Sequence, residues 1–118
     1  MRPSDDSSSG CTVPLTPAVF YILFALADGD KHGYAIMQET VKLSEGEFRM
    51  GSATLYTNIQ RLLAAGLIQE VSGGEQDPRR RNYRLKRQGR VALEQELERM
   101  RKVLRRAQRI AFAPKGAH

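Results

Sequence analysis

Apolar residues recur along the chain in spacings that predict four helices. The first apolar run begins after Thr16 and Pro17, an N-cap followed by a proline at the first helical position, and continues to about Ala27. Because this helix is apolar on nearly every side, we expect the chain's own core to cover one face and a second subunit to cover the rest. Phe20 and Phe24 are its candidate contacts with that subunit.

A second, amphipathic helix is predicted from His32 to the turn at Ser44. Its apolar stripe, with Ile36 beside it, consists of Tyr34, Met37 and Val41. His32 and Tyr34 lie at the start of this helix, where free backbone N–H groups favour anions. These two residues are therefore candidates for contact with phosphate, with a capping or packing role as the alternative.

A third helix is predicted from Ser52 to Ala65, closed by Gly66. Its apolar stripe consists of Leu55, Ile59, Leu62 and Leu63. The opposite face carries short polar groups and one long cation, which are Ser52, Ala53, Thr57, Asn58 and Arg61, with Tyr56 at the edge. Such a helix after a short helix and a tight link is typical of a helix-turn-helix, whose recognition helix enters a major groove about 12 Å wide. Any buried helix also has a polar outer face, so this feature alone leaves the function open.

A β-hairpin follows the third helix, because apolar and polar residues alternate over residues 67–71 and 82–85. The connection runs into three consecutive cations, Arg79, Arg80 and Arg81. Guanidinium groups suit phosphate oxygens or a narrow minor groove, so the hairpin predicts a wing that holds DNA. On the returning strand, Tyr83 is expected to face the core.

A long final helix is predicted from Lys86 to Ala113. Its apolar residues follow a spacing of four and three in turn, and they are Leu93, Leu97, Met100, Leu104, Ala107 and Ala111. This heptad seam is short, so it predicts helix packing within a homodimer rather than an extended coiled coil. Glu98 and Lys102 are spaced for an i,i+4 ion pair on the same helix.

Together these elements predict a mainly α fold with a small β-hairpin. A winged helix-turn-helix domain is expected over residues 13–85, and a C-terminal dimerisation helix over residues 86–113. Residues 1–12 are polar and rich in serine, which predicts a disordered N-terminal tail, and residues 114–118 are expected to be a frayed C-terminus.

Charge is distributed unevenly along the chain, whose net charge is +6. Residues 1–77 contain 5 basic and 10 acidic side chains, whereas residues 78–118 contain 14 basic and 3 acidic ones. This asymmetry favours contact between the C-terminal part and a polyanion, with a solvated basic face as the alternative.

Other chemistry is sparse in this sequence. Cys11 is the single cysteine, and His32 and His118 lack metal-ligand spacing, so we expect no disulfide within the chain and no metal or other cofactor. Neither a phosphate-binding glycine loop nor a nucleophile with a nearby base is present, which argues against an enzyme. The apolar run over residues 13–27 is shorter than the ~20 residues of a membrane-spanning helix, and a reducing cytoplasm fits best.

Two alternatives to DNA binding remain at this stage. One is a protein-interaction module that uses the winged-helix shape and apolar helices to bind a partner. The other is an RNA-binding protein, which is disfavoured because a helix cannot enter the deep and narrow major groove of A-form RNA.

Several short motifs, in this order and spacing, resemble the PadR family of transcriptional regulators. They are Leu15-Thr16-Pro17, His32-Gly33-Tyr34-Ala35-Ile36, Thr54-Leu55-Tyr56, Arg61-Leu62-Leu63, Gly66-Leu67-Ile68 and Arg80-Arg81-Asn82-Tyr83-Arg84-Leu85, ending at Gly89. The resemblance covers about residues 15–110. It implies a winged-helix repressor of the short subfamily, dimerised through its first and last helices. Such a repressor binds a pseudo-palindromic operator of double-stranded DNA and is released by a ligand or signal.

The resemblance also implies roles for individual residues. The recognition helix would present Ser52, Thr54, Tyr56, Thr57 and Arg61, the phosphate contacts would include His32 and Tyr34, and the wing would carry Arg79, Arg80 and Arg81. Some members of the family hold flat drugs between tryptophans at the dimer centre, and this chain has no tryptophan. A small apolar or aromatic effector would instead meet Phe20, Phe24, Met100 and Leu104.

Overall fold

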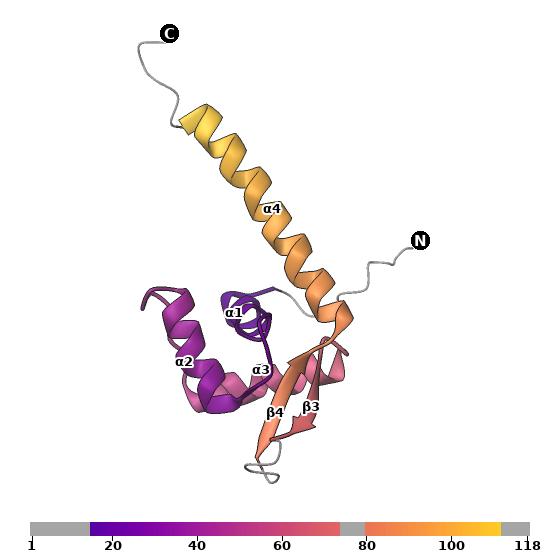
Figure 1. The fold of residues 1–118 in the computed structure, drawn as a ribbon. Coiled ribbons are helices and arrows are strands. Elements are labelled where there is room, and N and C mark those ends of the chain that lie inside the picture. Colours follow the sequence, from indigo (N-terminus) through magenta and orange to yellow (C-terminus); the bar gives the residue numbers. More distant parts are fainter. Residues whose placement is uncertain (1–14, 74–79, 112–118) are drawn as a thin grey trace.

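Three helices and a small sheet form one end of the molecule, and a long fourth helix extends away from them (Figure 1). A computed structural model of the chain describes residues 15–73 and 80–111. The elements in chain order are α1 (Pro17–Ala25), β2 (Lys31–His32), α2 (Gly33–Leu43), α3 (Ser52–Ala64), β3 (Ile68–Ser72), β4 (Arg81–Leu85) and α4 (Arg87–Ala111). The predicted tail, the predicted frayed end and Arg79 lie outside the described residues. The mainly α fold with a small antiparallel sheet is confirmed.

Helix α1 begins and packs as its sequence dictates, but it is covered more completely than we expected. The Val19 backbone N–H donates to the Thr16 hydroxyl at 3.3 Å, which confirms the N-cap, and the helix ends at Ala25. Helices α2, α3 and α4 of the same chain all contact α1. The expectation that its own core covers only one face is therefore wrong. Phe20 is only 8% exposed, while Phe24 is half-buried.

Helix α2 buries a different stripe from the predicted one. Its buried residues are Gly33, Ile36 and Thr40, whereas Met37 and Val41 are half-buried. Tyr34 is 61% exposed, so its assignment to the apolar stripe is wrong. Thr40 fits in the core because its hydroxyl donates to the Met37 carbonyl oxygen at 2.8 Å, which satisfies the polar group locally.

Helix α3 confirms its predicted apolar stripe. Leu55, Ile59 and Leu62 are fully buried, and Gly66 closes the helix end with a φ of +77°, a backbone conformation that favours glycine. Asn58 was expected on the outer face but is buried, which corrects that prediction. Its Nδ2 donates to the Thr54 carbonyl oxygen at 2.8 Å, so the amide needs no contact with solvent.

The sheet has three antiparallel strands in the order β2-β4-β3. The predicted hairpin forms β3 and β4, in which Ile68 pairs with Leu85 and Glu70 pairs with Tyr83. Strand β2 was not predicted. It contributes only Lys31 and His32, which pair with the other edge of β4.

An ion pair fastens β4 to the turn before β2. The Asp30 carboxylate accepts hydrogen bonds from Arg84 Nε at 3.0 Å and from the terminal guanidinium nitrogen NH2 at 2.8 Å. This hydrogen-bonded guanidinium lowers the pKa of Asp30 below its ordinary value. The pair joins two residues that lie 54 positions apart in the sequence.

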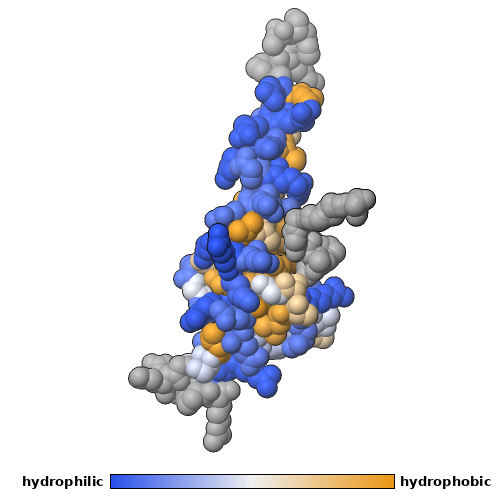
Figure 2. Space-filling view, turned by 90° about the vertical axis from the view of Figure 1, so that its right-hand side faces the viewer, coloured by the Kyte–Doolittle hydropathy of each residue, from blue (hydrophilic) through white to orange (hydrophobic). Residues whose placement is uncertain are grey.

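Helix α4 is packed at its start and free along its far half. Ala92 and Leu93 are buried in the core, and a Cβ at Gly89 would lie 2.1 Å from the Leu67 carbonyl oxygen. Apolar side chains continue as one edge of the projecting helix (Figure 2), where the exposed ones are Met100, Val103, Leu104 and Ile110.

The ion pairs on α4 differ from the predicted one. Glu98 pairs with Arg101 rather than with Lys102, and Arg99 pairs with Glu96 at 2.5 Å. Both pairs have i,i+3 spacing, which is as close on a helix surface as the predicted i,i+4 spacing.

Candidate nucleic-acid interface

The outer face of α3 presents all five residues that were predicted for the recognition helix. Ser52, Thr54, Tyr56, Thr57 and Arg61 are exposed, while the opposite stripe of α3 holds the helix against the core. A helix with small polar side chains on its outer face can approach base edges without steric obstruction. This exposed face of α3 therefore has the shape and chemistry needed to contact base edges, and we call it the reading head.

Tyr56 also holds α3 against the start of α2. A Cβ placed on Gly33 would lie 2.2 Å from the Tyr56 hydroxyl oxygen and 2.8 Å from Cζ, far inside van der Waals contact. Only glycine leaves room for the ring at this position. Tyr56 is thus both an exposed aromatic residue and the spacer between the two helices of the motif.

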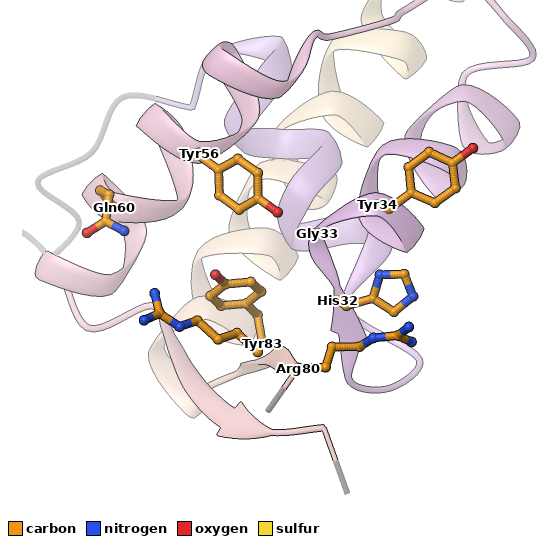
Figure 3. A pocket seen from close by; sticks show the side chains of 8 residues that line it. His32, Gly33, Tyr34, Tyr56, Gln60, Arg80 and Tyr83 are labelled. Atoms are coloured by element: carbon orange, nitrogen blue, oxygen red, sulfur yellow. The ribbon is translucent and has the colours of Figure 1, made fainter. Parts of the chain in front are cut away.

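An open pocket of about 380 Å³ lies between the start of α2, the outer face of α3 and strand β4 (Figure 3). We call it the tyrosine pocket. It is lined by His32, Gly33, Tyr34, Tyr56, Gln60, Arg80, Arg81 and Tyr83. This lining includes two guanidinium groups, one imidazole and three phenols, and it contains no carboxylate. Such a set of donors suits an anion.

His32 caps helix α2 from within this pocket. Its Nδ1 accepts a hydrogen bond from the Ala35 backbone N–H at 3.3 Å, which confirms the capping role. In the neutral ring, Nε2 then carries the proton and is a donor. Figure 3 shows His32 beside Arg80, and the Tyr34 hydroxyl pointing away from Tyr56 and Tyr83.

Tyr83 belongs to the core, as predicted, yet it also lines the pocket. The residue is 3% exposed, and burial raises the pKa of its phenol above the ordinary value of 10.0. Its oxygen points toward α3, beneath the ring of Tyr56 (Figure 3). From the sequence, a core position was favoured over a contact role for Tyr83, and the position of its polar end beside the pocket was not predicted.

The arginines of the wing are not equivalent. Arg81 pairs with Glu70 on the neighbouring strand, with 3.2 Å between Nε and the carboxylate oxygen, and most of its side chain remains exposed. Arg80 is exposed, immediately before the start of β4. Gln60, which the sequence analysis overlooked, lies one helical turn after Tyr56, and that spacing was the available signal.

The predicted dimer residues divide into two groups. Leu93 is only 4% exposed and packs in the chain's own core, and Leu97 and Ala107 are half-buried. Leu104 is 55% exposed, and Met100 is also exposed. The seam therefore begins as core and continues as an uncovered apolar edge.

Two other features are absent from the described part of the chain. No helix there is long and apolar enough to cross a membrane. Residues 15–73 and 80–111 also contain no group of three or more His, Cys, Asp or Glu side chains placed to hold a metal ion.

The fold has close relatives among solved structures. A transcriptional regulator from Clostridium thermocellum shares 26% identity at a TM-score of 0.66, over 79% of this chain and 88% of that one. H. salinarum RosR shares 28% identity at a TM-score of 0.60, over 73% of this chain and 74% of that one.

A PadR family transcription regulator from Clostridium difficile shares the same fold, at 24% identity and a TM-score of 0.69, over 81% of this chain and 99% of that one. Among curated proteins, no sequence matches this chain. Residues 22–95 match the Transcriptional regulator PadR-like family. The chain therefore belongs to the PadR-like family of transcriptional regulators, which have a winged-helix fold.

Proposed function

We propose that this protein is a homodimeric repressor that binds a pseudo-palindromic operator and acts in the cytoplasm. The observation that carries this proposal is the continuity of one surface, in which the outer face of α3 adjoins the acid-free tyrosine pocket and the arginines of β4. In a dimer, the two α3 helices would enter successive major grooves about one helical turn apart. The wings would then hold the flanking phosphates.

The exposed edge of α4 supports the dimer. Met100, Val103, Leu104 and Ile110 are large apolar residues on a helix that projects from its own domain, and water is a poor environment for such a stripe. A second copy of α4 would cover it with the same kind of residues.

We also propose that a small apolar or aromatic ligand regulates the dimer. Bound between the two α4 helices, it would change their crossing angle and thereby the spacing of the two reading heads. Phe24, Met100 and Leu104 are the apolar side chains with accessible surface for this contact. Phe20, which is buried against Phe24 with 5.6 Å between ring centroids, would support the site from below.

The double variant Arg80→Ala/Arg81→Ala tests the DNA-binding surface. We expect weaker binding to every duplex, because two cations that face phosphate are removed. The dependence of log affinity on log salt should become shallower by about 0.9 for each lost phosphate contact. Fluorescence anisotropy with labelled duplexes, titrated over a range of salt concentrations, measures both quantities.

The matched control is Arg105→Ala/Arg109→Ala, which removes the same charge from the exposed far half of α4. It should leave the salt dependence close to that of the original protein. Equal slopes for both double variants would refute the role of the wing. Tighter binding to duplex RNA than to duplex DNA of the same sequence would refute the proposed function as a whole.

A further inference from the structure

The tyrosine pocket contains a hydrogen-bond donor that the protein itself does not use. Tyr83 is only 3% exposed, yet it lines the open pocket, and none of the side-chain hydrogen bonds between described residues involves its hydroxyl. Because the ring is fixed in the core, its hydroxyl is held in place at the wall of the pocket, where it can donate a hydrogen bond to a ligand. The phenol is protonated at neutral pH, and burial raises its pKa further, so the hydroxyl is a donor.

Three independent features make the surroundings of this hydroxyl attractive to an anion. The first turn of α2, an 11-residue helix, begins at the pocket and contributes the positive end of its dipole. His32 has a donor at Nε2, because its Nδ1 is already occupied by the Ala35 N–H. Arg80 and Arg81 add positive charge, and Glu70, a carboxylate whose charge acts on Tyr83, is paired with Arg81.

The position of the pocket identifies the source of the anion. It lies between the exposed face of α3 and strand β4 of the wing, so a duplex that contacts both elements must pass over it (Figure 3). The anion that a duplex carries along such a path is a backbone phosphodiester. A free phosphate ion has the same oxygens but is not tied to any position of the DNA.

We propose that the tyrosine pocket binds one backbone phosphodiester of the operator, and that the Tyr83 hydroxyl donates a hydrogen bond to it. This inference rests on the proposed function. It assigns a binding role to a side chain of the core, and it places His32 Nε2 as a second donor to the same phosphate. Because a phosphodiester occurs at every step of the DNA, this contact supplies affinity and register rather than sequence choice.

The variant Tyr83→Phe tests the proposal, because it keeps the ring in the core and removes only the hydroxyl. We expect affinity for the operator to fall about tenfold, as for the loss of a hydrogen bond to a charged group. Thermal unfolding of the free protein should not change, since no hydrogen bond within the protein is lost. Tyr21→Phe is the matched control, because the Tyr21 ring is stacked on Phe48, at a centroid distance of 5.3 Å, rather than in the pocket.

The partner of the hydroxyl is then located by replacing operator phosphates one at a time with neutral methylphosphonates. One position in each half-site should weaken binding of the original protein and have a much smaller effect on Tyr83→Phe, which is the signature of a direct contact in a double-mutant cycle. Normal affinity of Tyr83→Phe, or a loss that couples to no single phosphate, would overturn the proposal while sequence-specific DNA binding by the original protein still stood.

A binding measurement with inorganic phosphate tests whether the pocket holds a free ion rather than a phosphodiester of DNA. If the pocket held a free ion, inorganic phosphate would bind the DNA-free protein and lose affinity in Tyr83→Phe, with no coupling to any DNA position. That result would also overturn the assignment to a backbone phosphodiester. Failure of the original protein to bind any duplex would instead remove the proposed function on which the inference rests.

Discussion

At the scale of single residues, Gly33 leaves the space that the ring of Tyr56 occupies. The ring of Tyr56 occupies the space in which any other residue at position 33 would carry its Cβ. The motif His32-Gly33-Tyr34 therefore combines a cap, a vacancy and an exposed aromatic residue in three successive positions. The space left by the missing Cβ of Gly33 is filled by Tyr56, a side chain of α3.

The variant Gly33→Ala should move Tyr56 out of place. The added Cβ meets the far end of a flexible side chain, so the fold should survive at a cost of about 1 kcal/mol, near the low end for overpacking. DNA affinity should fall, because Tyr56 no longer lies where α2 and α3 place it. Anisotropy measurements combined with thermal unfolding separate the two effects.

A double variant provides the control for this prediction. Once Tyr56 has been replaced by alanine, adding Gly33→Ala should weaken DNA binding no further, since the clash has disappeared. Fully additive losses in the double variant would show that Gly33 acts through something other than Tyr56.

Residue spacing predicted the buried leucines but not the buried polar residues. Leu55, Ile59 and Leu62 recur at helical intervals, and their burial follows from that pattern. Asn58 was misplaced and the burial of Thr40 was not predicted, because a polar side chain that bonds to a carbonyl of its own helix looks, in sequence, like one that faces water. The polar end of Tyr83 escaped prediction for a related reason, since burial of a ring does not tell where its hydroxyl points.

At the scale of elements, the sheet depends on a contact that is distant in sequence. Strand β2 has two residues, and the ion pair between Asp30 and Arg84 fastens its edge to β4. A hairpin could be predicted from alternation over five-residue strands, whereas two residues cannot show an alternating pattern. The third strand exists because the chain before α2 lies against the free edge of β4.

The variant Asp30→Asn should show how much the ion pair with Arg84 contributes to the free energy of unfolding, and that this contribution depends on pH. Arg84 lowers the pKa of Asp30 in the folded protein, so the pair stabilises the fold above the ordinary pKa of the carboxyl group, and this contribution is lost as the pH falls through the lowered value. The variant should therefore unfold at a slightly lower temperature at neutral pH, and the difference should vanish in strong acid. The effect should be small, because the pair is partly exposed.

Thermal unfolding followed by circular dichroism across the acid range measures this difference. Asp28→Asn is the matched control, because Asp28 pairs with Lys31, which lowers its pKa in the same way but lies only three residues away and not on a distant strand. A constant gap between Asp30→Asn and the original protein at every pH would contradict the assignment.

At the scale of the whole molecule, the two halves of α4 differ in burial. Its start is part of the core through Leu93, and its far half carries an apolar edge into solvent. A heptad spacing predicted the seam but could not distinguish residues that pack in their own chain from residues that stay exposed in the single chain, because both can follow the same periodicity. The domain itself makes this division by covering only the first turns of the helix.

The variant Leu104→Asp should dissociate the proposed dimer without unfolding the protein. Leu104 is 55% exposed in the single chain, so an aspartate there costs little until a second α4 must cover it. Sedimentation velocity should show a monomer, and affinity for a two-fold symmetric site should fall at least tenfold because the two half-sites are no longer bound together.

Arg105→Asp serves as the control, since it changes the charge even more on the exposed face beside the apolar edge. That variant should remain a dimer. A dimer that persists in Leu104→Asp would show that α4 pairs elsewhere, whereas Leu93→Asp would answer nothing, because Leu93 is needed by the core.

The single residue between β4 and α4 has a mechanical consequence. Strand β4 ends at Leu85, α4 begins at Arg87, and the Lys86 backbone N–H donates to the Leu67 carbonyl oxygen at 3.0 Å, so the join leaves no length for a hinge. Strand β4 and helix α4 should then move as one rigid unit. The arm of α4 that extends from the buried Leu93 to Ala111 is about 27 Å long. A pivot of about 10° would move the end of that arm by about 5 Å. In the proposed dimer, a change in how two such arms cross would therefore be passed on to the bound DNA, and one residue inserted at the join would rotate the arm by about 100° relative to α3 of its own chain.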